Sequence, residues 1–131
     1  MKIAFEAHKN QVDKSGVPYI YHPIHLAEQM TDELTTIVAL LHDVVEDSDI
    51  TFDLLISEGF PNEAIEALVL LTHTEDIPYL EYVQAIKTNK VATIVKLADL
   101  KHNSDLTRLD NNIKAKERVK KYSKAIGILE K

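Results

Sequence analysis

LLHDVVEDSD, residues 40–49, closes a long apolar run with one histidine and four acidic residues. The pattern predicts a single helix over 32–46, whose apolar and polar side chains separate onto two sides at ~100° per residue. A helix with one apolar side buries that side against other helices. The apolar side holds Leu34, Ile37, Val38, Leu40, Leu41, Val44 and Val45, and the polar side holds Thr35, Thr36, His42, Asp43, Glu46 and Asp47.

The polar side of this helix has two interpretations. It is either an ordinary solvated face, because charged side chains usually face water, or a cation site. Acids near a helix C-terminus oppose the helix dipole by roughly 0.3–1 kcal/mol each, and a bound cation removes that conflict. Histidine and aspartate supply ligands suited to Mn, Fe, Zn or Mg. In the second interpretation, His42 and Asp43 bind the metal, and Glu46 and Asp47, one turn on, position water or a proton.

Length and composition limit the class of protein. The 131 residues suffice for one domain, 1–131, with a single core. The absence of cysteine, of a membrane-spanning apolar run and of a signal-peptide pattern favours a cytosolic protein that does not contact membranes. The net charge of −6 argues against nucleic-acid binding, which requires a basic face.

Helical periodicity covers most of the chain, and no alternating strand pattern is found. The predicted class is all-α, a single-domain bundle of short, uneven helices that cross one another. Thr51 and Pro61 are expected at helix starts and Gly59 at a helix end. Residues 13–18 are predicted to form a loop. The predicted helices are 2–11, 23–31, 32–46, 51–58, 62–73, 78–88, 89–104 and 112–130.

The segment VATIVKLADLKHN, residues 91–103, is apolar around most of its circumference, which indicates a buried helix. Lys96, Asp99 and Asn103 nevertheless lie within about 60° of one another on this helix. A buried carboxylate is costly unless it is paired or bound to a metal. Asp99 is therefore either one half of a local ion pair with Lys96 or a metal ligand from a second helix.

The segment KSGVPYIYHPIH, residues 14–25, leads from the loop into a helix. Pro23 suits the first helical position, so His22 is expected to cap that helix. His22 and His25, one turn apart, are competing candidates for a metal ligand or are ordinary surface or core histidines. Lys14, beside Gly16, is a candidate phosphate contact. The residues interpreted as structural are His8, His73, His102, Tyr79 and Tyr82.

Three stretches, in this order, carry a resemblance to a known family. KSGVPYIYHP resembles K-S-G-x-P-Y-x-x-H-P, LLHDVVEDSDIT resembles L-L-H-D-x-V-E-D-T-x-x-T, and VKLADLKHN resembles V-K-L-A-D-x-x-x-N. These are motifs of the HD superfamily of metal-dependent phosphohydrolases. The closer resemblance is to the hydrolase domain of RelA/SpoT-like enzymes and to the small alarmone hydrolases, and it spans residues 8–110.

The resemblance implies the all-α HD-domain fold, one divalent metal that is usually manganese, and a nucleotide polyphosphate substrate. The implied reaction removes pyrophosphate from the 3′ position of guanosine tetra- or pentaphosphate, with no synthetase domain present. Lys96 is expected to neutralise phosphate charge together with Lys14. Carried over position by position, the metal ligands are His22, His42, Asp43 and Asp99, the catalytic acidic pair is Glu46 and Asp47, and the substrate contacts include Lys14 and Asn103.

Two positions depart from the family pattern. Asp13 and Asp105 stand where the hydrolases commonly have arginine. Arg108 is expected to compensate in part as a further substrate contact. The departures keep two alternatives open: an HD phosphohydrolase for another nucleotide or phosphate ester, and a non-catalytic helical module that binds a nucleotide or a partner.

Overall fold

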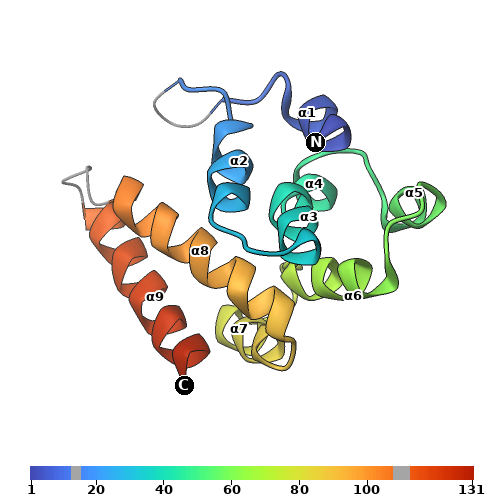
Figure 1. Ribbon diagram of the computed structural model, residues 1–131. Helices are drawn as coiled ribbons and strands as arrows, with labels where there is room; N and C mark the ends of the chain where they lie inside the picture. Colours follow the sequence, from blue (N-terminus) through green and yellow to red (C-terminus); the bar gives the residue numbers. More distant parts are fainter. Residues whose placement is uncertain (13–15, 108–112) are drawn as a thin grey trace.

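The computed structural model describes residues 1–12, 16–107 and 113–131 (Figure 1). These residues confirm the all-α class, and among them extended pairing is limited to an isolated antiparallel bridge between Val12 and Pro18. In this described part of the chain, no helix is long and apolar enough to cross a membrane. The helices are α1 (Lys2–His8), α2 (Tyr21–Glu28), α3 (Glu33–Leu41), α4 (Val44–Asp47), α5 (Phe52–Ser57), α6 (Asn62–Leu71), α7 (Tyr79–Lys87), α8 (Lys90–Thr107) and α9 (Ile113–Glu130).

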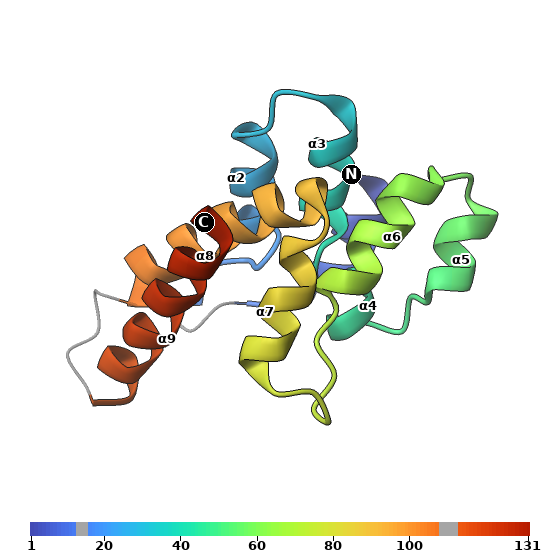
Figure 2. The ribbon, with the colours of Figure 1, turned by 90° about the horizontal axis from the view of Figure 1, so that it is seen from below.

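Helix α8 is the central element of the fold. It runs antiparallel to α9, and α2, α3, α6 and α7 also pack against it (Figures 1 and 2). Ala92, Val95, Ala98 and Leu100 are all buried, as the apolar pattern of 91–103 predicts. Any polar side chain on the inner part of α8 is therefore held away from bulk water by several neighbouring helices.

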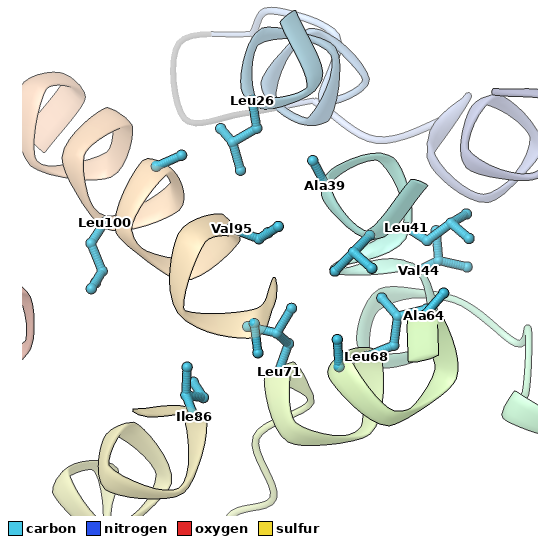
Figure 3. Close-up of a cluster of buried hydrophobic side chains, with 14 of the residues drawn as sticks. Leu26, Ala39, Leu41, Val44, Ala64, Leu68, Leu71, Ile86, Val95 and Leu100 are labelled. Atoms are coloured by element: carbon cyan, nitrogen blue, oxygen red, sulfur yellow. The ribbon is translucent and has the colours of Figure 1, made fainter. Parts of the chain in front are cut away.

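The core joins the helices that carry the candidate site residues (Figure 3). The side chains labelled in Figure 3 come from α2, α3, α4, α6, α7 and α8, and Val95 points from α8 toward α3. Because this packing is dense, it fixes α2, α3, α4 and α8 relative to one another. The labelled members, each at most 4% exposed, are Leu26, Ala39, Leu41, Val44, Ala64, Leu68, Leu71, Ile86, Val95 and Leu100.

Several predicted helix limits are confirmed. Thr51 caps α5 by accepting a hydrogen bond from the Leu54 N–H at 3.2 Å, and Gly59 follows the end of α5 with φ of 88°. Asp32 caps α3 in the same way, accepting from the Thr35 N–H at 2.7 Å. Pro61 occupies the cap position of α6. Elsewhere the limits shift: α1 ends at His8, and α8 continues to Thr107.

The prediction of one helix over 32–46 was wrong. Helix α3 ends at Leu41, and Asp43, with φ of −108° and ψ of 2°, separates it from α4. The physical reason is His42, whose Nδ1–H donates to the Ala39 carbonyl at 2.7 Å and takes the acceptor that the next backbone N–H would use. Glu46 and Asp47 therefore belong to α4, and Thr35, expected on the polar side, is buried.

The predicted role of His22 as a helix cap was also wrong. Helix α2 begins at Tyr21 with Ile20 as its cap, so His22 is the second helical residue and Pro23 the third. Proline is tolerated there because the first N–H groups of a helix have no partner within the helix. His22 therefore projects from regular helix.

The packing predicts a large cost for a cavity at Leu68. Leu68→Ala should lower the free energy of unfolding by about 2–5 kcal/mol, because the side chain is 1% exposed and α3 and α8 both pack against its helix. Urea denaturation measures the change. Leu54→Ala is the matched control, since Leu54 is 43% exposed, and equal losses in the two variants would contradict the packing described.

Candidate metal centre and its surroundings

Four side chains from α2, the α3–α4 junction and α8 meet beside the core. His22 Nε2 lies 2.8 Å from Asp99 Oδ1, and His42 Nε2 lies 3.0 Å from Asp43 Oδ2 and 3.4 Å from Asp99 Oδ1. Neighbouring ligands around a cation with bonds of about 2.1 Å are about 3 Å apart. The ligand atoms of His22, His42 and Asp43 all lie within 4.8 Å of one another, so these residues can hold a metal ion.

The surroundings of His42 Nε2 show whether this residue is suited to bind a metal. Because Nδ1 donates to Ala39, Nε2 carries the lone pair in the neutral ring and faces the cluster. Nε2 is buried and has no hydrogen-bond partner among the described residues, although Asp43 lies near it. Buried polar atoms normally have a partner. A metal ligand whose other nitrogen is fixed by a carbonyl matches this arrangement.

The charges of the cluster favour a positive occupant. Burial lowers the pKa of His42, but the Asp43 and Asp99 carboxylates outweigh burial and hold that pKa well above its usual value. Burial likewise raises the pKa of Asp99, whereas Lys96, His22 and His42 outweigh it and keep that pKa well below its usual range. Burial also raises the pKa of Asp43, but His42 outweighs burial and lowers that pKa, so both carboxylates stay ionised and attract a cation to the atoms between them.

The ion pair expected between Asp99 and Lys96 is confirmed, and the role of Asp99 as a metal ligand stays a prediction. Its Oδ2 accepts from Lys96 Nζ at 3.1 Å, which is the local ion pair, while its Oδ1 faces His22 and His42. Asn103 Nδ2 also donates to Oδ1 at 3.1 Å. Burial lowers the pKa of Lys96, but Asp99 outweighs it and raises that pKa, so the ammonium stays charged. Lys96 thereby offsets one buried carboxylate.

Glu46 and Asp47 lie in α4, the short helix that directly follows Asp43, and both side chains are largely exposed. Partial burial raises the pKa of both carboxyl groups, and Asp43 raises it further. Asp43 raises the pKa of Glu46 more than the neighbouring Asp47 does. The arrangement places two carboxyl groups with raised pKa values in α4, next to the cluster.

The sequence did not identify His102 as part of the site. Its Nδ1 lies 2.7 Å from His22 Nδ1, the ring planes are 9° apart, and the ring centroids are 4.9 Å apart, so the two rings meet edge to edge and nearly in one plane. When His22 offers Nε2 to a cation, its Nδ1 carries the proton and donates to His102. The spacing of three residues between Asp99 and His102 on one helix was the available signal.

Tyr19 is the second residue that the sequence did not identify. Its hydroxyl donates to Asp43 Oδ2. Burial, followed by Asp43, raises the pKa of Tyr19, so the hydroxyl keeps its proton and remains a donor. Tyr19 lies just before α2, and only the three-dimensional structure brings it to Asp43.

A cleft of about 470 Å³ opens beside the cluster, between α2 and α8. His22, His102 and Asn103 form the wall nearest the cluster. His25 also lines this cleft, but its ring is exposed and contacts His102 at a centroid distance of 4.3 Å, so it lies outside the cluster. Lys14, Arg108 and Asp13 lie outside the described residues.

The residues interpreted as structural have identifiable contacts. Tyr82 is 7% exposed and donates to the Leu71 carbonyl at 2.6 Å, as expected for a core residue. Tyr79 is only partly buried, with Lys121 Nζ 4.0 Å from the centre of its ring. His73 Nε2 is 2.7 Å from the Ile77 carbonyl oxygen. His8 is buried and packs on the Tyr19 ring, as expected for a structural residue, and its Nδ1 lies 2.8 Å from the side-chain oxygen of Gln11.

Comparisons with known proteins place the chain in a family, although no family model matches it. It is 37% identical over 134 residues to the guanosine-3′,5′-bis(diphosphate) 3′-pyrophosphohydrolase MESH1 of Mus musculus, covering 90% of the chain and 74% of that protein. It is 33% identical over 115 residues to a probable GTP pyrophosphokinase of Mycobacterium leprae, covering 78% of the chain and 14% of that protein. It is 46% identical over 54 residues to the bifunctional (p)ppGpp synthase/hydrolase SpoT of Escherichia coli, covering 38% of the chain and 8% of that protein.

A solved structure of a metazoan ortholog of SpoT that hydrolyzes ppGpp and plays a role in starvation responses has the same fold. The TM-score is 0.76 at 23% identity, covering 98% of this chain and 82% of that chain. The predicted single-domain helical bundle is thereby confirmed.

The contact between His102 and His22 predicts a change in metal affinity. His102→Ala should weaken Mn²⁺ binding by about 10- to 100-fold, because His22 loses the partner that orients its ring. Equilibrium Mn²⁺ titration measures this. His25→Ala is the matched control, because it removes a ring that contacts His102, and it should leave the affinity unchanged. Equal affinities of His102→Ala and the wild type would refute the orienting role.

Proposed function

Because this chain belongs to the family of MESH1- and SpoT-like guanosine-3′,5′-bis(diphosphate) 3′-pyrophosphohydrolases, we propose that it removes pyrophosphate from the 3′ position of guanosine tetra- or pentaphosphate. The observation that carries this proposal is the buried His42 Nε2, which faces Asp43 and Asp99 without a hydrogen-bond partner among the described residues. A cytosolic location stays a prediction from the sequence.

The proposed ligands of one divalent metal are His22, His42, Asp43 and Asp99. Their nitrogen and carboxylate donors suit manganese, which the family resemblance suggests, and also iron or zinc. When bound, the metal polarises a phosphoryl oxygen and lowers the pKa of a water molecule.

Glu46 and Asp47 are the proposed acid–base pair. They lie in α4, directly after Asp43, and their exposed carboxyl groups can reach water and a phosphate ester at the edge of the cluster. One carboxylate accepts a proton from the attacking water, and one carboxyl group donates a proton to the leaving 3′ oxygen. Such groups typically contribute a factor of about 10² to 10⁴ in rate.

Two of the four proposed substrate contacts are supported by their positions in the structure, and the other two by the sequence alone. Asn103 lines the 470 Å³ cleft and reaches Asp99, so it can contact a substrate beside the metal ligands. Lys96 is charged and lies beside Asp99, where it can attract a phosphate group. Lys14 and Arg108 are proposed from the family resemblance and the sequence alone.

A second candidate substrate class is favoured by Asp105. This residue is exposed near the end of α8, two residues after Asn103, where the family commonly has arginine. A carboxylate there disfavours a highly charged polyphosphate relative to a smaller phosphate ester. The alternative keeps the same metal ligands and the same acidic pair.

The assay is pyrophosphate release from guanosine 3′,5′-bis(diphosphate) with Mn²⁺. The wild-type protein should release pyrophosphate, and Glu46→Gln and Asp47→Asn should each lower kcat by about 10²- to 10⁴-fold, because each removes a proton-transfer group. Mn²⁺ affinity should change little in both variants, since neither residue is a proposed ligand. Glu58→Gln, an exposed change in the loop after α5, is the matched control with wild-type kcat.

Two other assay results would favour the alternative functions. Turnover only of other nucleotides or of simple phosphate esters in a substrate panel would favour the second class. Mn²⁺ binding without turnover of any substrate in the panel would favour a non-catalytic binding module.

A further inference from the structure

A chain of hydrogen bonds connects the end of α1 to α4, and two of its members, His8 and Gln11, lie outside the three motifs of the family resemblance. Gln11 Nε2 donates to the Asp47 carbonyl at 2.9 Å and to the Ala7 carbonyl at 3.1 Å. His8 Nδ1 lies 2.8 Å from Gln11 Oε1. Gln11 is 36 residues from Asp47 in sequence, so this is a tertiary contact and not a local turn.

The hydrogen bonds determine the orientation of each group. The two amide hydrogens of Gln11 go to two carbonyl oxygens, so its Oε1 is the acceptor and His8 Nδ1–H is the donor. His8 is 1% exposed, and its ring packs on the Tyr19 ring at a centroid distance of 4.8 Å. The buried His8 therefore holds the Gln11 amide in the orientation that faces Asp47.

Helix α4 needs such support because it is short. It has only four residues, whereas an isolated helix requires more than ten residues to be stable, and its last carbonyl groups lack partners within the helix. Gln11 supplies a donor to the carbonyl of Asp47, its last residue. At the other end, Tyr19 donates to Asp43, the cap residue of α4. Gln11 and Tyr19 thus contact the two ends of α4.

We propose that Gln11, oriented by His8, is a positioning residue that fixes α4 and thereby the carboxyl groups of Glu46 and Asp47 relative to the metal ligands. The inference rests on the proposed function for its catalytic consequence. Gln11 does not contact the cluster itself. It acts through the Asp47 backbone, so losing it should disturb the placement of the acidic pair and leave the metal ligands in place.

Gln11→Met tests this proposal, because methionine keeps the length of the side chain and removes all three hydrogen bonds. We expect kcat to fall about 10- to 100-fold while KM stays within about twofold and Mn²⁺ affinity is unchanged. Gln11→Glu is the second variant. It keeps an acceptor for His8 but places a carboxylate against the Asp47 carbonyl, so it should show the same loss of kcat.

Gln29→Met is the matched control. Gln29 is an exposed glutamine whose amide donates to the His25 carbonyl of its own helix at 3.2 Å, so its replacement should leave kcat unchanged. A wild-type kcat in both Gln11 variants would overturn the proposal. So would a parallel loss of kcat and Mn²⁺ affinity, since that pattern indicates general destabilisation and not a displaced acidic pair.

Amide hydrogen exchange separates this proposal from the proposed function. The Asp47 N–H bonds to the Asp43 carbonyl at 2.9 Å within α4, and in Gln11→Met its exchange should accelerate by about fivefold or more. Exchange of amides in α6 should not change. If the wild type releases no pyrophosphate, the proposed function fails. The placement of α4 by Gln11 is then judged by exchange alone, and unchanged exchange at Asp47 overturns it.

Discussion

The structure is built around two ionised carboxylates, Asp43 and Asp99, that face the buried His42 Nε2 beside the core. Bringing Asp99 into the interior of α8 is costly, and Lys96 on one oxygen and two histidines on the other offset that cost. The four residues of the cluster come from three segments, α2, the α3–α4 junction and α8, so the core that aligns these helices is also what assembles the cluster. A divalent cation would suit the atoms that His22, His42 and Asp43 bring within 4.8 Å of one another, since it can accept a lone pair from each of these residues.

His42 connects the fold to the proposed chemistry. One ring nitrogen ends α3 by bonding to Ala39, and the other faces Asp43 and Asp99. Because the helix ends there, Glu46 and Asp47 turn out of the line of α3 into α4 and become exposed beside the cluster. A continuous helix would place the acidic pair differently, so the break is part of the site. The short α4 then needs external contacts, which Gln11 and Tyr19 provide.

The sequence predicted the features that follow from periodicity and burial. The all-α class, the buried α8 and the unusual position of Asp99 all follow from where apolar and charged residues recur. The break after Leu41 did not follow, because a helical wheel assumes backbone hydrogen bonds and does not include a histidine side chain that takes one of their acceptors. The start of α2 was misplaced because Pro23 is allowed at several positions of the first turn.

The supporting residues were harder to predict than the cluster itself. His102 could have been found from its spacing to Asp99 on one helix. Tyr19 is the first tyrosine of the motif KSGVPYIYHP, but the sequence predicts no partner for it or for Gln11, because the partners lie 24 and 36 residues away and only the packing of α1 and α2 brings them together.

The most direct test of this account is anomalous diffraction from crystals of the protein soaked in Mn²⁺. We expect one strong manganese peak about 2.0–2.3 Å from His22 Nε2, His42 Nε2 and carboxylate oxygens of Asp43 and Asp99. A cluster that binds no manganese in such crystals, or a peak bound only by Glu46 and Asp47, would contradict it.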